Sequence, residues 1–119
     1  MGVDLTPVSR MAEAMARHPD KLEARLFTDR ERAFCRAKAN AAQHFAARFA
    51  AKEAVLKALS VPKGLSWHEL EVVNDPNGAP RLELHGEAAR AAQRAGIQRP
   101  HLSLTHAGDQ ALAFVVAER

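Results

Sequence analysis

The chain has 119 residues, which supports one domain built around a single hydrophobic core. Apolar residues make up 47% of it and charged residues 26%, an ordinary balance for a globular protein, and no apolar run approaches the roughly 20 residues that cross a bilayer. The formal net charge of +3 favours an acidic partner or a phosphate-bearing substrate.

Other compositional features argue against secretion, disulfide bonds and binding of single-stranded nucleic acid. The opening residues 1–4 have neither the basic nor the apolar segment of a secretory signal, so we expect a cytoplasmic protein that does not bind membranes. Cys35 is the single cysteine, which excludes an internal disulfide and favours a buried, idle thiol. Tyrosine is absent, and Trp67 with five phenylalanines gives too few aromatics for a platform that stacks single-stranded nucleic acid.

The first half of the chain is predominantly helical. Residues 3–5 predict a short strand, and residues 9–17 predict a helix that Pro19 stops. Residues 28–31 have the form of a capping box, with Thr at the cap and Glu three residues later, and open a second helix that continues to about Lys38.

An alanine-rich helix follows a brief break at residues 40–44. It runs from about Phe45 and ends near residues 60–62, because Pro62 cannot continue it. The second half then changes to strands. The predicted elements are strands at residues 67–73, 81–85, 101–105 and 111–117, a turn at 75–78 and a helix at 86–95. The predicted fold class is α+β, with helices packed on a small, largely antiparallel sheet.

Four charged residues interrupt the alanine-rich helix, which is otherwise apolar on nearly all sides. They are Arg48, Lys52, Glu53 and Lys57. Charges in such a helix are costly unless they are paired or bind an ion or ligand. Glu53 with Lys57 one turn later is therefore a candidate functional pair. The alternative is that the two residues, four positions apart, only form an ion pair on the helix surface.

Three segments in the observed order carry a family resemblance. They read Gly-Val-Asp at residues 2–4, Arg-Phe-Ala-Ala-Lys-Glu-Ala-Val-Leu-Lys-Ala at 48–58 and Leu-Ser-Leu-Thr-His at 102–106. Together they resemble the holo-acyl-carrier-protein synthases, small phosphopantetheinyl transferases that move 4'-phosphopantetheine from coenzyme A to a serine of an apo acyl carrier protein. Linking segments at 26–28, 67–72 and 77–80 extend the resemblance over nearly the whole chain, and the middle block is its most specific part.

The resemblance implies a catalytic Mg²⁺ ion held by Asp4 and Glu53. Attack of a serine hydroxyl on the β-phosphorus of coenzyme A develops charge on pyrophosphate oxygens, which a divalent cation stabilises. Mg²⁺ favours a few carboxylates together with water and substrate phosphates. Lys57 resembles the family lysine that neutralises phosphate and assists proton movement, so Glu53 and Lys57 are the expected catalytic residues. The alternatives are a turn aspartate at residue 4 and a lysine that merely extends to solvent at residue 57.

The resemblance also implies a binding site for coenzyme A. The expected contacts are Arg48, Lys57, Gly78, Pro80, Thr105 and His106, with Ser103 on the same strand face as Thr105. A strand-end core histidine and a simple hairpin turn are the alternatives for His106 and Gly78. Where the family often has a glycine-rich stretch after the lysine, this chain has a shorter loop in which we expect Ser60 or Lys63 to contact the pyrophosphate.

The implied partner is an acidic acyl carrier protein, either free or as a domain of a synthase. Arg10 on the first helix is the main candidate for this contact, with Arg17 and Arg25 as secondary candidates. The alternative is that these arginines simply form a solvent-exposed helix face. The resemblance further implies a homotrimer with active sites at subunit boundaries.

Three other interpretations were weighed. One is a transferase dedicated to a large multidomain fatty acid or polyketide synthase, which the sequence does not separate from one that serves a free carrier. A noncatalytic RNA- or DNA-binding module would need Lys and Arg along one face, whereas these residues are spread along the chain. A zinc protein would need paired ligand spacing, which the six histidines lack.

Overall fold

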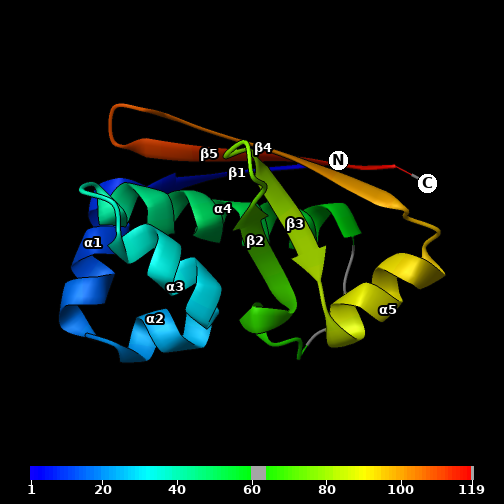
Figure 1. The fold of residues 1–119 in the computed structure, drawn as a ribbon, viewed down its shortest axis with the longest axis horizontal. Helices are drawn as coiled ribbons and strands as arrows, with labels where there is room; N and C mark the ends of the chain where they lie inside the picture. Colours follow the sequence, from blue (N-terminus) through cyan, green and yellow to red (C-terminus); the bar gives the residue numbers. More distant parts are fainter. Residues whose placement is uncertain (60–63, 119) are drawn as a thin grey trace.

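The computed structural model describes residues 1–59 and 64–118. Figure 1 shows the arrangement of its helices and strands. In chain order these are β1 (Gly2–Pro7), α1 (Val8–Arg17), α2 (Lys21–Leu26), α3 (Asp29–Arg36), α4 (Ala41–Leu59), the 3₁₀ helix η1 (Trp67–Glu69), β2 (Leu70–Asn74), β3 (Pro80–Leu84), α5 (Gly86–Arg94), β4 (Arg99–Ala107) and β5 (Gln110–Glu118). Within these described ranges, no helix combines the length and the hydropathy needed to cross a membrane.

The α+β class is confirmed, but the strands form two sheets instead of one. A three-stranded antiparallel sheet has the order β1-β5-β4, and β2 pairs with β3 in a separate antiparallel hairpin. The long helix α4 lies against one face of the three-stranded sheet, here called the inner face (Figure 1). Strand β5 is thus the centre of the sheet, and β1 and β4 are its two edges.

The contact between β1 and α4 is unusually close because of a glycine. Gly2 is buried, and a Cβ atom at this position would lie 2.1 Å from the carbonyl oxygen of Ala54. Only glycine fits so near a helix backbone. This approach places Asp4, two residues further along the same strand face, beside the C-terminal half of α4.

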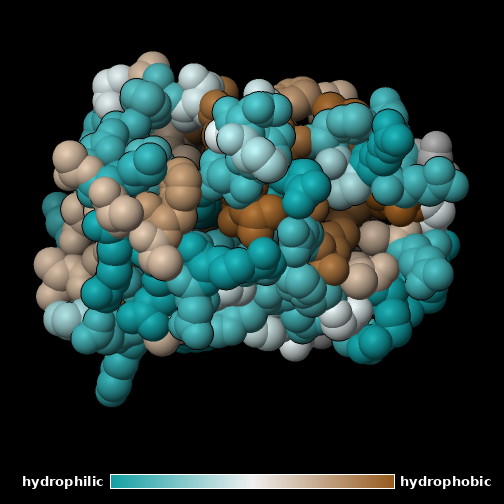
Figure 2. All heavy atoms as spheres, in the orientation of Figure 1, coloured by the Kyte–Doolittle hydropathy of each residue, from teal (hydrophilic) through white to brown (hydrophobic). Residues whose placement is uncertain are grey.

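The outer face of the same sheet is apolar and exposed. The register pairs Val3 with Phe114, and Leu5 with Leu112. Val3 is 48% exposed, Leu5 58% and Phe114 39%. Figure 2 shows hydrophobic surface along the upper edge of the molecule, where this sheet lies. The prediction of a strand at residues 111–117 that is apolar on both faces is therefore correct in pattern, although only its inner face is buried within one chain.

A second core lies among α1, α2, α3 and the first turns of α4. Phe27 and Phe45 meet there with ring centroids 4.9 Å apart. Cys35 is fully buried in this core, and burial raises the pKa of its thiol to about 12. The prediction of a buried, idle thiol is thus confirmed, because a thiol with so high a pKa stays protonated and unreactive.

A fully buried ion pair joins the helical half to the strands. Lys52 Nζ donates to Glu31 Oε1 at 2.7 Å, and both side chains have zero exposure. Each side-chain polar atom of the pair has further partners or shares them, because Glu31 also accepts from the backbone of Thr28 and Val72, and Lys52 donates to the carbonyl of Trp67. Burial lowers the pKa of Lys52, and the charge of Glu31 offsets part of this effect.

Several element boundaries differ from the predictions. The capping box at Thr28 is confirmed, but the break before the alanine-rich helix is earlier, since α4 begins at Ala41. The strand predicted at 67–73 is wrong at its start, because a second capping box between Ser66 and Glu69 closes a 3₁₀ turn there and the strand begins at Leu70. Helix α2 was not predicted, and the end predicted near residues 60–62 lies outside the described residues.

Candidate active site

Asp4, Glu53 and Lys57 meet where β1 crosses α4, and we call them the acidic site. Lys57 Nζ donates to Asp4 Oδ1 at 2.9 Å and to the carbonyl oxygen of Val3 at 3.3 Å. Lys57 therefore pairs with an aspartate from another element, and a simple Glu53–Lys57 surface pair is not the arrangement found. The resemblance implied that Asp4 lies near Glu53, and the structure places Asp4 in contact with Lys57, one turn after Glu53.

The electrostatics of the acidic site fit a divalent cation. Partial burial, followed by the charge of Asp4, raises the pKa of Glu53, and Lys57 lowers it by a smaller amount. The hydrogen bond and charge of Asp4 raise the pKa of Lys57. Two adjacent carboxylates with one ammonium leave a net negative charge. Because neither carboxylate is fully buried, the donor set matches Mg²⁺, which keeps water and phosphate ligands.

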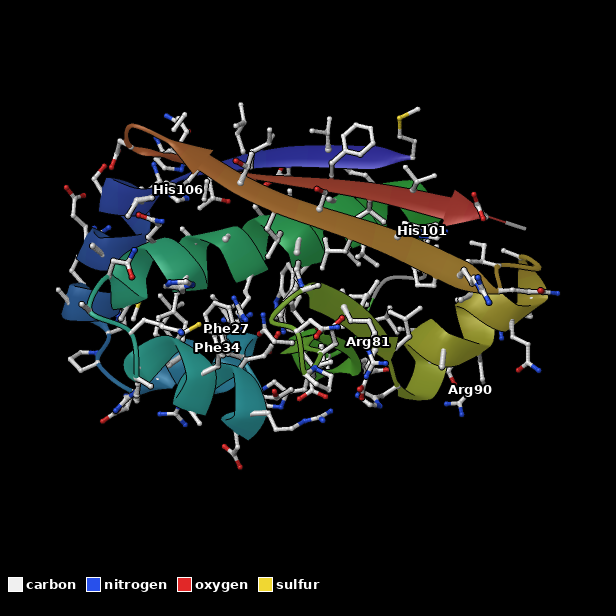
Figure 3. All side chains as sticks on the ribbon, turned by 45° about the horizontal axis from the view of Figure 1, so that its top comes forward. Phe27, Phe34, Arg81, Arg90, His101 and His106 are labelled. Atoms are coloured by element: carbon white, nitrogen blue, oxygen red, sulfur yellow. The ribbon has the colours of Figure 1, made fainter. Side chains whose placement is uncertain are left out.

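A second site is a pocket of about 350 Å³ between α3, α4, β4 and the tip of the β2–β3 hairpin. Four of the predicted coenzyme A contacts line it, namely Arg48, Gly78, Pro80 and His106. Figure 3 shows His106 near the end of β4 that lies over the first half of α4, on the same side of the molecule as Phe34. We call this cavity the basic pocket.

Positive side chains dominate the basic pocket. Its basic lining residues are Lys38, His44, Arg48 and His106, and none of the described residues that line it is acidic. Burial lowers the pKa of His44, and the positive charges of Arg48, Lys38 and His106 lower it further. A bound anion would relieve this repulsion, so the pocket suits a phosphate-bearing ligand.

Arg48 is the buried anchor of this pocket. It is 2% exposed, its Nη2 donates to Asn74 Oδ1 at 2.6 Å, and its guanidinium carbon lies 4.2 Å from the centre of the Phe34 ring. Its Nε has no hydrogen-bond partner among the described residues. A buried donor left unpaired costs about 1–3 kcal/mol, which a ligand acceptor can recover.

The sequence analysis missed Phe34, Lys38, His44 and Asn74 as pocket residues. His44 lies one helical turn before Arg48, so the four-residue spacing on one helix face was a usable signal. No comparable pattern exists for Lys38 and Asn74, because α3 and the hairpin meet only in the folded chain.

Thr105 does not join either site in one chain. Along β4, side chains alternate between the two sheet faces, so Thr105 and Ser103 lie on the exposed outer face while Leu104 and His106 lie on the inner one. The acidic site and the basic pocket themselves lie toward opposite edges of the sheet, at β1 and β4. Ser60 and Lys63 lie outside the described residues.

Arg10 lies on the rim of an apolar groove of about 210 Å³. Leu22, Leu26 and Phe49 line the groove together with Thr6. Thr6 also donates a long hydrogen bond of 3.5 Å to Asp4, so one lining residue of the groove contacts the acidic site.

Comparisons with known proteins identify the family. The family model described as the 4'-phosphopantetheinyl transferase superfamily matches residues 1–115. The chain belongs to this superfamily. It is 51% identical to the holo-[acyl-carrier-protein] synthase of Desulforudis audaxviator over 118 residues, covering 98% of this chain and 90% of the relative.

Solved structures of phosphopantetheinyl transferases agree with this assignment. The holo-[acyl-carrier-protein] synthase of Neisseria meningitidis superposes with a TM-score of 0.90 at 28% identity, covering 99% of this chain and 96% of the other. The Helicobacter pylori synthase, crystallised in complex with coenzyme A, gives a TM-score of 0.85 at 28% identity and covers 98% of each chain. The chain is thus an enzyme of the phosphopantetheinyl transferase class.

Substitution of Glu53 tests the acidic site of this transferase. We expect E53Q to reduce turnover by about 100-fold or more, because it removes one of the two carboxylates expected to hold Mg²⁺. The same variant should melt at a temperature no lower than the wild type in metal-free buffer, since it removes a partly buried charge beside Asp4. Rates and circular-dichroism melts, with E87Q at an exposed position of α5 as the control, measure both effects. A wild-type rate for E53Q would exclude Glu53 from the site.

Proposed function

We propose that the protein transfers 4'-phosphopantetheine from coenzyme A to a serine hydroxyl of an apo acyl carrier protein, in a Mg²⁺-dependent reaction. The whole chain, residues 1–119, forms one transferase domain, and we propose that it acts in the cytoplasm in fatty acid biosynthesis. The observation that carries the proposal is the acidic site of Asp4, Glu53 and Lys57, assembled from two distant segments in a phosphopantetheinyl transferase.

The reaction forms a bond between the serine oxygen and the β-phosphorus of coenzyme A. The bond from that phosphorus to the bridging oxygen breaks, the hydroxyl proton is lost, and adenosine 3',5'-bisphosphate leaves. Asp4 and Glu53 would hold Mg²⁺, which supplies charge stabilisation to the pyrophosphate when bound.

Lys57 supports the same step from the protein side. Its side chain is 56% exposed and its ammonium group donates to Asp4, which raises its pKa, so the group can face phosphate oxygens while remaining protonated. As a compact point charge with three donors, it neutralises charge on the leaving phosphate and is positioned to pass a proton to it.

The basic pocket would bind the nucleotide end of coenzyme A. Its supports are the cluster of cationic side chains, the unpartnered Nε of Arg48 and the aromatic ring of Phe34. Gly78 and Pro80 shape one wall at the hairpin tip. A buried arginine with an unpaired N–H donor is well suited to bind a phosphate oxygen.

The surface formed by α1 and α2 would bind the carrier protein. The apolar groove beside Arg10 includes Thr6, which contacts Asp4, and a neighbouring basic hollow is lined by His18, Lys21, Leu22 and Arg25. Acyl carrier proteins are acidic, so these cations would orient the carrier while the groove accepts an apolar side chain.

We further propose a homotrimer, as the family resemblance implies. The exposed outer face with Val3, Leu5 and Phe114 supports burial against another copy, and Thr105 lies on this face. Thr105 would then contact coenzyme A only across a subunit boundary.

We expect the wild-type mass from light scattering to be three times that of one chain, and L5E to shift the mass toward the monomer. A monomeric wild-type enzyme with full activity would contradict the trimer.

Intact mass spectrometry tests the transfer reaction directly. After incubation of the enzyme with coenzyme A, Mg²⁺ and an apo acyl carrier protein, we expect the carrier to gain one phosphopantetheine mass. Excess chelator should abolish the gain, and added Mg²⁺ should restore it. A gain that persists in chelator would remove the metal from the proposal.

Free carriers and excised synthase domains, tested side by side, would separate a general transferase from a dedicated one.

Charge reversal at Arg10 tests the carrier surface. We expect R10E to raise the KM for the carrier about tenfold while leaving the KM for coenzyme A unchanged, because a cation that meets an acidic partner becomes repulsive. R94E on α5, far along the chain and on another helix, provides a matched control. Equal carrier KM values for R10E and wild type would exclude Arg10 from the docking surface.

A further inference from the structure

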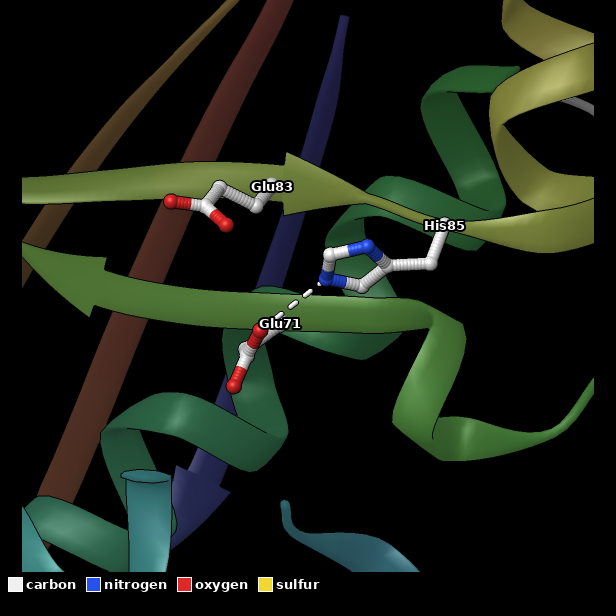
Figure 4. A group of neighbouring side chains, drawn as sticks. All are labelled: Glu71, Glu83 and His85. Carbon is white, nitrogen blue, oxygen red and sulfur yellow. Dashed lines mark hydrogen bonds and ion pairs between the residues drawn. The ribbon is translucent and has the colours of Figure 1, made fainter. Parts of the chain in front are cut away.

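Glu71, Glu83 and His85 form a cluster on the β2–β3 hairpin, away from the acidic site (Figure 4). Such a group could hold a metal, but its ligand atoms are already engaged. Glu71 Oε1 accepts from Arg30 Nη2 at 2.6 Å and is 2.9 Å from His85 Nε2, and Glu71 Oε2 accepts from Arg30 Nε at 3.1 Å. The guanidinium therefore takes the place that a cation would occupy.

Arg30 offsets the repulsion between two carboxylates of the hairpin. The strand register places Glu71 directly opposite Glu83, and like charges in that position push strands apart. The same Nη2 of Arg30 that contacts Glu71 also donates to Glu83 Oε1 at 2.8 Å. One side chain of α3 thus bridges both carboxylates of the hairpin, and we call this contact the Arg30 bridge.

The inner end of the Arg30 bridge is buried and strongly bound. Glu71 is 4% exposed and also accepts a hydrogen bond from Thr28. Burial alone would raise the pKa of Glu71, but the hydrogen bonds from Arg30, Thr28 and His85 hold that pKa at about 2. A carboxylate bound this tightly fixes the start of α3 to the start of β2.

The two elements that the bridge joins are also walls of the basic pocket. Phe34 lies one turn after Arg30 on α3, and Lys38 follows the end of that helix. From the hairpin come Asn74, which binds Arg48, and the turn at Gly78. Arg30 itself does not line the pocket, so it acts on the pocket only through the spacing of these walls.

We propose that Arg30 is a positioning residue for coenzyme A: by bridging Glu71 and Glu83 it holds α3 and the hairpin tip at the separation that the nucleotide pocket requires. This inference rests on the proposed function. Loss of the bridge removes one of the contacts between α3 and the hairpin, leaving the Glu31–Val72 hydrogen bond, and leaves two opposed carboxylates on neighbouring strands. Both changes widen or loosen the basic pocket while leaving the acidic site on β1 and the far part of α4 intact.

Steady-state kinetics of R30A test this inference. We expect the KM for coenzyme A to rise about three- to tenfold, and the Kd from calorimetry to rise in parallel, with little change in kcat or in the KM for the carrier. The matched control is R36A on the same helix. Arg36 also bridges two carboxylates, Glu23 and Asp20, but these belong to the α2 side and not to the hairpin.

A rescue variant and the R36A control together separate positioning from general loss of stability. In R30A/E83Q the opposed charge pair is gone, so the KM for coenzyme A should return part of the way to the wild-type value. R36A should keep the wild-type KM for coenzyme A even where its melting temperature falls as far as that of R30A, because the bridge of Arg36 does not join the hairpin. Unchanged coenzyme A binding in R30A, or an equal rise in both KM values, would overturn the positioning role. Wild-type enzyme that does not modify any carrier would instead overturn the proposed function, so the two failures are distinct.

Discussion

The buried ion pair between Glu31 and Lys52 is the constraint on which the rest of this small fold depends. It joins α3 to α4, and through backbone hydrogen bonds it also holds β2 and η1. A buried pair that loses one partner typically costs about 3–5 kcal/mol, a large share of the roughly 5–15 kcal/mol that stabilises a domain. Because every polar atom of the pair is satisfied, the charges specify one arrangement of helices and hairpin, and the basic pocket forms in that arrangement.

The four charged residues of α4 lie on two different faces of the helix, and each face contributes to a different site. Arg48 and Lys52 are one turn apart and face α3 and the hairpin, where they are buried. Glu53 and Lys57 are one turn apart on another face, beside β1. The alanines between them, together with Gly2, allow neighbouring backbones to approach closely. One helix therefore fixes the distance between Arg48 in the basic pocket and the acidic site, while the other walls of the pocket come from α3, the hairpin and β4.

Local patterns predicted the elements well, because helix caps, prolines and alternating strands act over a few residues. The capping box at Thr28 and the turn before Pro80 are examples. The family motif at residues 48–58 led to Asp4, Glu53 and Lys57, which the structure brings together. What failed depended on distant contacts: the partner of Lys52 is 21 residues away, and the walls of the basic pocket come from four separated segments. A sequence pattern cannot supply such pairings, since residues at 38 and 74 share no periodicity.

The placement of the two sites bears on the proposed assembly. The acidic site lies at the β1 edge of the three-stranded sheet and the basic pocket toward the β4 edge, while the outer face of the sheet is apolar. In a ring of identical copies joined by heterologous contacts, different surfaces of neighbouring chains meet at each boundary. A boundary that buries the outer face can therefore bring Thr105 and the β4 edge of one copy toward the acidic site of the next. Each boundary would then complete one site, and the burial of Val3, Leu5 and Phe114 would couple assembly to catalysis.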